Sequence, residues 1–152
     1  MCNEEYGYLI EGKSKNGMAL FNKQQDYEQY LRLMWKYKKR FKVQVYAYCL
    51  LPESVHLLIN PLVPKVISDF MKGIHQMYAR YFNETYERRG SVWKDCCHYV
   101  AMYDNKDLVS CVRLIERLPV EHGLALLSEG YPYSSCGYRV MGKGLLDKGI
   151  AH

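Results

Sequence analysis

The sequence predicts an α+β protein, built as a small antiparallel sheet with helices on one or both of its faces. Stretches rich in β-branched and aromatic residues alternate with longer stretches in which apolar residues recur at helical spacing. Two of the strand-like stretches are separated only by Pro52-Glu53, which indicates an antiparallel hairpin. At 152 residues and 49% hydrophobic content, the chain is long enough for one compact domain and short for two.

The N-terminal part of the chain predicts a strand, a turn and a helix. Residues 6–10 form a short strand, and a turn follows at 12–17. Asp26 is a candidate N-cap, with Gln29 completing a capping box, and helical spacing continues to about Arg40. The apolar residues at this spacing are Tyr27, Tyr30, Leu31, Met34 and Trp35.

The predicted hairpin pairs residues 43–51 with 55–60. Alternate residues of its first strand are expected on one face of the sheet, namely Val43, Val45, Ala47, Cys49 and Leu51. A second helix then runs from about Ile67 to about Tyr86 and ends in a basic loop.

The C-terminal part predicts a further strand and a third helix. Residues 91–101 are the strand candidate, although their alternation is poor. Asn105 or Asp107 can cap the helix, which is expected to stop before Pro119 because the residue preceding proline avoids helical dihedrals. Residues 1–140 are therefore expected to form the domain, and 141–152 a flexible, glycine-rich tail.

Composition and cysteine spacing disfavour several classes of protein. The start MCNEEYGY has no basic flank followed by an apolar run, so we expect a cytoplasmic protein whose six cysteines are reduced thiols. No C-x-x-C pair is present, and adjacent Cys96-Cys97 is poor geometry for two ligands of a structural zinc. No apolar run approaches about 20 residues, so no membrane span is expected.

The charge composition permits a polyanionic partner without requiring one. The net charge is +5, and basic residues gather at 36–42 and 88–94, each group beside tyrosine or tryptophan. The 15 tyrosines include aromatic faces on which single-stranded bases can stack. The same features are also typical of a solvated helix face and of tyrosines that simply pack.

Four motifs, in consistent order and spacing, carry a resemblance to a known family. Residues 48–58 read YCLLPESVHLL, close to the family's Y-C-x-M-P-N-H-V-H-L-L. Residues 78–93 match Y-x-x-Y-x-N-x-x-Y-x-R-x-G-x-x-W, residues 114–123 (LIERLPVEHG) echo Y-I-E-x-N-P-V-x-x-G, and 133–135 (YSS) echo W-S-S. The chain thus resembles the small tyrosine transposases of the HUH superfamily, in particular the REP-associated tyrosine transposase-like proteins of bacteria.

The resemblance implies a ferredoxin-like fold, in a family that is commonly dimeric, and single-stranded or hairpin DNA as the substrate of DNA transposition. In active members an H-x-H pair holds Mg²⁺ or Mn²⁺, which polarises the scissile phosphate, and a tyrosine hydroxyl attacks to leave a 5′-phosphotyrosine link. The spacing suits this chemistry because residues i and i+2 of a strand point to one face.

This chain departs from the family at the positions that carry the chemistry. Ser54 stands at the first metal histidine and leaves His56 alone, while Leu114 stands at the nucleophilic tyrosine and Leu118 at the following asparagine. One histidine does not hold a divalent ion by itself. The adjacent Glu53 would face the other side of the strand unless the turn is bulged. Cys96 and Glu11 also replace family arginines.

The residues that survive are suited to binding. By the match to the family, the candidate DNA contacts are Arg80, Arg88, Arg89, Trp93 and Lys94. Each functional interpretation has a structural alternative. His56 can be a hydrogen-bonded core residue and not a metal ligand, Trp93 can pack over the core, and residues 88–89 can belong to a solvated loop.

Three hypotheses follow. The first is a transposase-like protein that binds DNA without cutting it. The second is an active metal-dependent nuclease with a relocated nucleophile, for which the candidates are Tyr78, Tyr81, Tyr99 and Tyr103. The third is an RNA-binding or protein-interaction module, although no stretch resembles the RNA-reading strand typical of that class.

Overall fold

The computed structural model describes residues 7–95 and 98–140, and the side chains of 138–140 are not part of this description. Its elements are β1 Gly7–Lys13, α1 Gln24–Phe41, β2 Val43–Leu51, β3 Ser54–Pro61, α2 Val66–Thr85, β4 His98–Met102, α3 Asn105–Glu121 and α4 Ser135–Val140, with 3₁₀ turns at Lys15–Gly17 and Ser128–Gly130. The expected tail at 141–152, and Cys96, lie outside the described residues.

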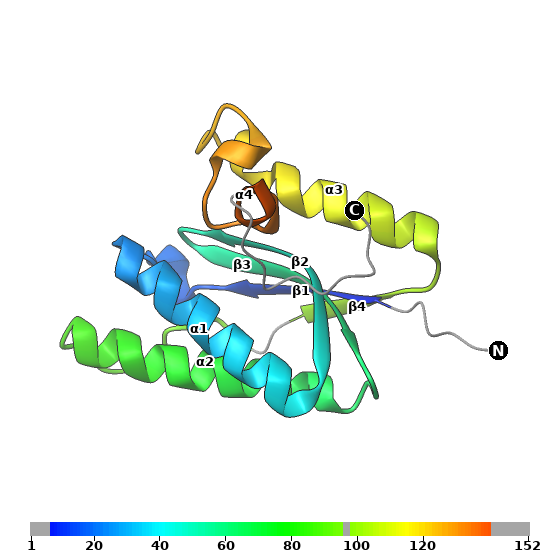
Figure 1. Cartoon of the computed structure of the whole chain (residues 1–152). Helices are drawn as coiled ribbons and strands as arrows, with labels where there is room; N and C mark the ends of the chain where they lie inside the picture. Colours follow the sequence, from blue (N-terminus) through cyan, green and yellow to red (C-terminus); the bar gives the residue numbers. More distant parts are fainter. Residues whose placement is uncertain (1–6, 96–97, 141–152) are drawn as a thin grey trace.

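The four strands form one sheet in the order β2-β3-β1-β4, and every neighbouring pair is antiparallel. Strands and helices up to β4 follow in the order βαββαβ, which together with this sheet order is the ferredoxin-like arrangement. Helices α1 and α2 cover one face of the sheet, and α3 and α4 lie on the other (Figure 1). The α+β prediction is therefore confirmed, with helices on both faces.

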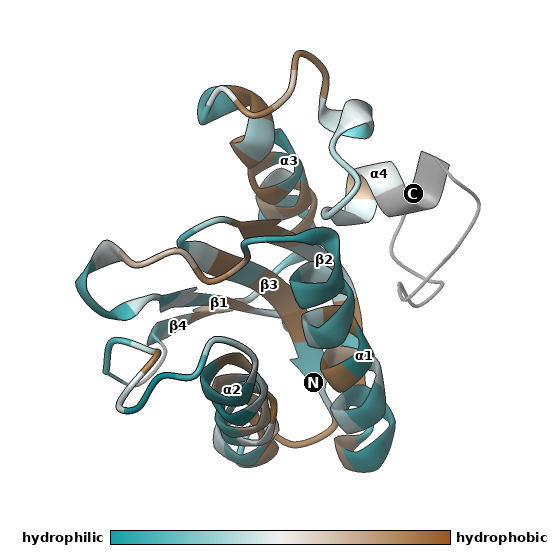
Figure 2. Cartoon of the chain, turned by 90° about the vertical axis from the view of Figure 1, so that its left-hand side faces the viewer, coloured by the Kyte–Doolittle hydropathy of each residue, from teal (hydrophilic) through white to brown (hydrophobic). Residues whose placement is uncertain are grey.

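Two apolar clusters hold these layers together. The larger cluster lies between the sheet and α1 and α2, and fully buried Tyr30, Phe70 and Tyr78 are among its largest side chains. The smaller cluster joins the sheet to α3 and includes Leu108 and Ile115. Figure 2 shows apolar colour on the strands and a polar outer surface on α1 and α2. Burying these apolar faces is the main contribution to the stability of the fold.

Strand β2 contains a β-bulge that the sequence did not predict. Its register against β3 shifts between Val45 and Ala47, so two residues on β2 oppose one on β3. As a result Val45 packs under α1 and α2, whereas Ala47 and Cys49 pack on the α3 side. The expected single face along the whole strand is wrong, because one extra residue reverses the side-chain alternation.

Asp26 is not the cap of the first helix. The N-cap of α1 is Lys23, and Asp26 is fully buried within the first turn. Its carboxylate accepts hydrogen bonds from the hydroxyls of Tyr81 (2.6 Å) and Tyr86 (2.5 Å). A carboxylate that looks like a local cap thus joins α1 to α2. On the same helix Trp35, which was placed at core spacing, is 37% exposed.

Four other boundaries differ from the prediction. Strand β1 continues to Lys13, and β4 begins only at His98, as a short edge strand. Asp104 caps α3 by accepting from the backbone N–H of Asp107, and the helix continues past Pro119 to Glu121. Pro119 is buried in the last turn, so the N–H that proline lacks and the conflict of its ring with the preceding turn affect only the end of the helix. Among the described residues, no helix is both long and apolar enough to cross a membrane.

Candidate nucleic-acid interface

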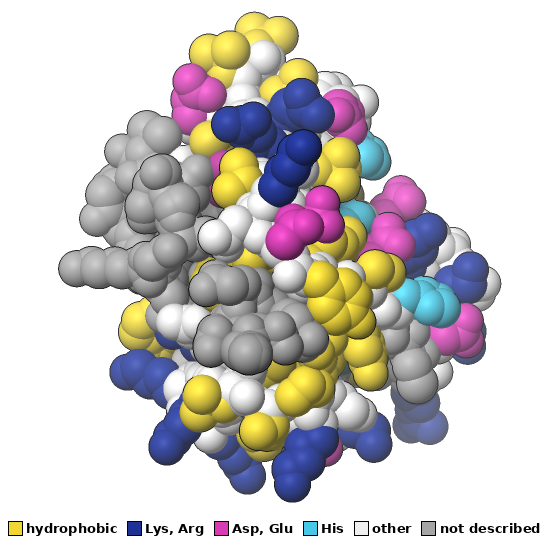
Figure 3. Space-filling view, turned by 90° about the vertical axis from the view of Figure 1, so that its right-hand side faces the viewer, with side chains coloured by type: hydrophobic (Ala, Val, Ile, Leu, Met, Phe, Trp, Pro, Cys, Tyr) yellow, Lys and Arg dark blue, Asp and Glu magenta, His cyan; other side chains and the backbone are white. Residues whose placement is uncertain are grey.

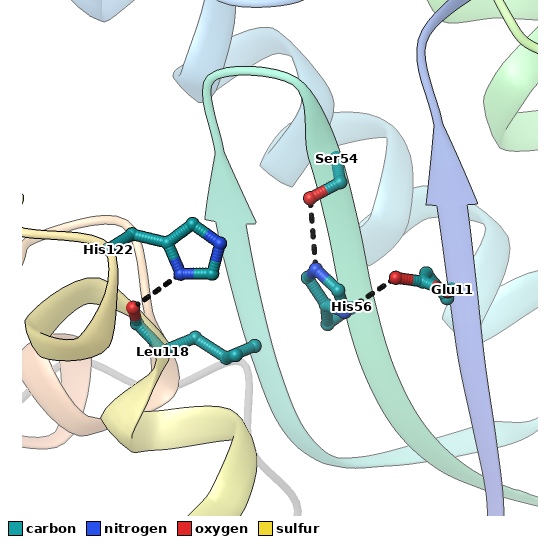
Figure 4. A network of polar contacts seen from close by, with 5 residues as sticks. All are labelled: Glu11, Ser54, His56, Leu118 and His122. Atoms are coloured by element: carbon teal, nitrogen blue, oxygen red, sulfur yellow. Dashed lines mark hydrogen bonds and ion pairs between the residues drawn. The ribbon is translucent and has the colours of Figure 1, made fainter.

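Ser54 and His56 lie at the start of β3, directly after the Pro52-Glu53 turn. As residues i and i+2 of a strand, they point to the same face. The Ser54 hydroxyl and the His56 Nε2 are 2.9 Å apart and hydrogen-bonded (Figure 4). One nitrogen of the His56 ring is therefore engaged by a serine hydroxyl.

His56 is largely buried, with 14% of its side chain exposed. Burial lowers its pKa, the Glu11 carboxylate raises it in part, and the nearby charges of His122 and Lys13 lower it further. Although Glu11 Oε2 lies 3.9 Å from His56 Nδ1, the lowered pKa means that the imidazole is neutral near pH 7. The contact with Glu11 is then a polar contact and not an ion pair.

The residues around His56 do not fit the divalent metal of the family. Cys49, His56, Glu11 and His98 occupy successive positions across the four strands. Within residues 7–95 and 98–140, however, no three His, Cys, Asp or Glu side chains converge closely enough to hold a metal ion. Burial also raises the pKa of the Cys49 thiol to about 12, so Cys49 is not a ready thiolate ligand.

Helix α3 carries the two leucines that the family motif places at its tyrosine and asparagine positions. Leu114, the predicted nucleophile position, is 46% exposed, whereas Leu118 packs against the smaller apolar cluster. Only one of these two leucines has therefore become part of the packing. At the end of the helix the ring of His122 bonds to the Leu118 carbonyl at 3.0 Å (Figure 4). Sequence reasoning missed His122, and its only signal was its place just before Gly123 at a helix end.

Three of the family motifs meet inside the fold. Ser135, from the C-terminal YSS, is fully buried and donates a hydrogen bond to the carboxylate of buried Glu116, two residues after Leu114. The same hydroxyl accepts from the backbone N–H of Tyr48, in the hairpin motif. These motif positions therefore have a structural role that joins α3, α4 and β2.

The candidate arginines differ in how far they are already engaged. Arg88 bonds to the side chain of Asn83 (2.7 Å) and to the Ser91 carbonyl (3.3 Å), so it braces the loop after α2. Arg80 pairs with Glu84 at 3.4 Å on the exposed face of α2. Arg89 is exposed in the same loop. The structure thus favours Arg89 as an available cation, while Arg88 also has a structural role.

Trp93 is held rigidly beside the core. Its ring stacks on His75 with centroids 3.6 Å apart and an angle of 4°, and its Nε1 donates to the His75 carbonyl at 3.0 Å. Burial lowers the pKa of His75 to about 3, so this imidazole is neutral. Its Nε2 is hydrogen-bonded to the Tyr30 hydroxyl at 2.8 Å. Trp93 is partly exposed and lines two surface cavities, while Lys94 is exposed next to it.

The four alternative nucleophiles fall into two groups. Tyr78 is fully buried and donates to the Leu20 carbonyl, and burial raises its pKa strongly. The hydroxyl of Tyr81 is bound to Asp26, and its pKa is raised to about 12. Both phenols are poor nucleophiles near pH 7. Tyr99 and Tyr103 are 55% and 66% exposed, at β4 and just after it.

Comparisons with known proteins agree with the motifs. A family profile described as "Transposase IS200 like" matches residues 12–116, more than half of the chain. The chain belongs to the IS200-like transposase family. A search of curated proteins found no match.

Solved structures similar to this IS200-like transposase family member share its fold. One is a REP-associated tyrosine transposase bound to a REP hairpin, with 18% identity, a TM-score of 0.77, and coverage of 98% of this chain and 87% of that chain. Another is a putative transposase from Deinococcus radiodurans R1, with 17% identity, a TM-score of 0.50, and coverage of 74% of this chain and 88% of that chain.

The basic side chains of this family member are spread over more than one surface. On the face in Figure 3, Lys and Arg gather along the lower margin, where α1 and α2 lie, and again near the top, where α3 lies. At the end of α1, the Nζ atoms of Lys38 and Lys39 lie 5.4 and 5.0 Å from the centroid of the Trp35 ring. Lysine side chains next to an exposed indole are typical of surfaces that bind single-stranded nucleic acid, so the end of α1 is a second candidate surface.

Proposed function

We propose that the chain binds single-stranded or hairpin DNA and does not form the phosphotyrosine link of its family. The observation that carries this proposal is Leu114. It occupies the nucleophile position on α3 and has no hydroxyl, although its side chain is 46% exposed and a tyrosine would fit there without disturbing the core. The hydrogen bond between Ser54 and His56 supports the same conclusion for the metal position.

The family's metal would polarise the scissile phosphate, but the residues described around His56 do not fit it. What this chain's residues supply is binding. Arg89 and Lys94 offer exposed cations to phosphates, and Trp93 offers an ordered ring to a base. The REP-associated relative was solved with a REP hairpin, which supports hairpin DNA as the ligand to try first.

A second candidate function keeps the chemistry with a relocated nucleophile. The exposure of Tyr99 and Tyr103 is the observation that favours it, because both side chains are accessible from solvent. Tyr78 is disfavoured by its burial, and both Tyr78 and Tyr81 are disfavoured by the hydrogen bonds of their hydroxyls. An RNA ligand remains the third candidate.

A binding and adduct assay separates these candidates. Fluorescence anisotropy with a labelled DNA hairpin carrying single-stranded ends is expected to show binding that weakens as salt rises from about 50 to 200 mM, because lysine and arginine contacts release counterions. The same DNA with Mn²⁺ or Mg²⁺ is expected to give no covalent adduct on a denaturing gel. An adduct lost in Tyr99→Phe or Tyr103→Phe would establish the second candidate, and stronger competition by RNA would establish the third.

We also propose that the protein acts in the bacterial cytoplasm and forms a homodimer, as the family commonly does. Light scattering after size-exclusion chromatography, with and without the hairpin, tests the oligomeric state. A single mass of about 18 kDa, the mass of one chain, in both samples would contradict the homodimer.

A further inference from the structure

The second half of α1 carries a dense group of positive charges. Six of the chain's 21 Lys and Arg residues lie within positions 29–52, a stretch that contains no acidic residue, so this stretch alone accounts for the net charge of +5. We call the group the α1-end surface, and its members are Arg32, Lys36, Lys38, Lys39, Arg40 and Lys42, together with Trp35. All of them are exposed except Lys38, which is half-buried.

The face of α1 opposite this surface is packed in the core. It belongs to the larger apolar cluster and is formed by Tyr30, Leu33, Met34 and Tyr37. Tyr37 lies so close to α2 that a Cβ on Gly73 would be only 2.7 Å from its Cε1 atom. An amphipathic helix binds a membrane by inserting its apolar face. That face is not available here, so the α1-end surface can offer a partner only charged groups and one indole.

The cations of the α1-end surface are not neutralised by the rest of the described chain. Within residues 7–95 and 98–140 no ion pair forms at Arg32, Lys36, Lys39, Arg40 or Lys42. Basic residues in the last turn stabilise a helix by opposing its macrodipole, but this effect is confined to that turn and does not account for Arg32 and Lys36. A group of like charges repels itself, and an anionic ligand removes this repulsion.

The spacing of the cations favours the backbone of duplex DNA. Arg32, Lys36 and Arg40 follow at i, i+4 and i+8 along one side of the helix, a distance of about 12 Å. Duplex DNA carries about seven phosphate charges over that length of its axis. Single strands bind through several aromatic faces in succession. Here Tyr37 is buried and Phe41 is half-buried, so phosphates are the main groups that this surface can contact.

The α1-end surface lies far from the loop after α2. Helices α1 and α2 are antiparallel, because Asp26 in the first turn of α1 bonds to Tyr86 just after α2, while Tyr37 near the end of α1 packs on Gly73. With 20 residues, α2 is about 30 Å long. The two basic regions therefore lie at opposite ends of this helical layer (Figure 1).

We propose that the α1-end surface binds the phosphate backbone of a duplex DNA segment, independently of base sequence and separately from DNA held at the loop after α2. Exposed Glu28 and Glu84 lie on α1 and α2 between the two regions, so the cations do not form one continuous path. One chain then holds two DNA segments. The inference goes beyond the proposed function, because the loop after α2 takes no part in it.

A charge-matched pair of double variants tests the α1-end surface on the full chain. Anisotropy measures binding of a labelled, blunt duplex of about 20 base pairs as the salt concentration is varied. Lys39→Ala with Arg40→Ala should lower the slope of the logarithm of the binding constant against the logarithm of the salt concentration by about 1.8, and should weaken binding at least about tenfold at about 100 mM salt. Lys106→Ala with Arg113→Ala removes the same charge from exposed positions of α3 and should weaken binding less than about twofold.

Equal weakening by both double variants would show an effect of net charge only and would overturn the proposal. A second pair on the same surface, Arg32→Gln with Lys36→Gln, should repeat the loss seen with Lys39→Ala and Arg40→Ala. Urea denaturation checks that each variant is folded. If one pair on the α1-end surface fails to fold, the other gives the result.

Competition identifies the ligand. Unlabelled duplexes of different sequence should displace the labelled duplex equally well at equal phosphate concentration. Displacement by polyglutamate or by phosphatidylserine vesicles as effective as that by duplex would overturn the assignment to DNA. A thymidine single strand that competes better than the duplex would overturn the assignment to duplex.

A capture experiment tests whether the two DNA segments bind at separate surfaces. Protein held on an immobilised single strand should capture a labelled duplex, and the Lys39→Ala, Arg40→Ala variant should stay on the strand but capture little duplex. Release of the protein from the strand by the duplex would show one shared surface and would overturn the inference. If single strands and hairpins bind but duplex does not, only this inference fails. If duplex binds at the α1-end surface and the other DNAs bind nowhere else, the proposed function fails and the duplex surface stands.

Discussion

Ser135→Ala tests whether the C-terminal motif stabilises the fold or serves the ligand. The Ser135 hydroxyl is fully buried and lies 2.5 Å from Glu116 Oε2 and 3.1 Å from the backbone nitrogen of Tyr48. Removing it takes a donor from a buried carboxylate and an acceptor from a buried backbone N–H. We therefore expect a loss of stability with no direct effect on DNA contacts.

The size of the loss follows from these two bonds. A hydrogen bond to a charged group contributes roughly 1.5–3 kcal/mol, and a buried group left without a partner costs roughly 1–3 kcal/mol. Allowing for partial relaxation, we expect the free energy of unfolding to fall by about 3 kcal/mol. With an m-value of about 2 kcal/mol/M, the urea midpoint should fall by about 1.5 M.

Urea denaturation followed by circular dichroism measures this change, with Ser110→Ala on the exposed face of α3 as the matched control. The control should change stability by less than about 0.5 kcal/mol. A cycle with Glu116→Gln should give a coupling energy of about 1–2 kcal/mol with Ser135→Ala, because the two side chains touch. A loss below about 1 kcal/mol in Ser135→Ala would refute the reasoning, since the buried groups would then have found other partners.

Three further predictions test the buried imidazole, the basic surface and the missing chemistry. Burial lowers the pKa of His75 to about 3, so on acidification this histidine is protonated in the unfolded state before the folded state. The free energy of unfolding should therefore fall by about 2 kcal/mol from pH 8 to pH 5. Urea titrations at both pH values should show a smaller fall in His75→Phe. For single-stranded DNA, Lys94→Ala should reduce the slope of the logarithm of the binding constant against the logarithm of the salt concentration by about 0.7. The control Lys106→Ala, on α3, should leave this slope unchanged. Equal slopes in the two variants would contradict a phosphate contact at Lys94. The double variant Ser54→His with Leu114→Tyr is expected to give a Mn²⁺-dependent covalent adduct that the parent chain lacks, and a denaturing gel checks this.

Local patterns were sufficient for much of the fold. The hairpin followed from two strand-like stretches around Pro52-Glu53, and α2 followed from its apolar spacing, with Phe70, Ile74 and Tyr78 all buried as expected. These features depend on neighbours within a few residues, or on burial of one face. The assignment of Ser54 and Leu114 to the family's histidine and tyrosine positions rests on motif order alone and stays a prediction.

Other features depended on residues distant in the sequence and were missed. The role of Asp26 is set by Tyr81 and Tyr86, which are 55 and 60 residues away in the chain. The bond between Ser135 and Glu116 likewise joins two segments that no local pattern connects. The bulge in β2 left no signal, because both faces of that strand are apolar and either alternation satisfies the pattern.

By itself, the sequence determined the fold class and the family, and it predicts that the family's histidine and tyrosine are replaced, because each of these inferences depends on residue identity and spacing. Only the tertiary structure decided what surrounds those positions: a hydrogen bond that occupies His56, an exposed Leu114 and a nearby pocket lined by lysines, carboxylates and Trp93. The physical reason is that pairing and burial are properties of the packed chain. A lysine, a glutamate and a tryptophan from three separate segments line one pocket only after the sheet and its loops have come together.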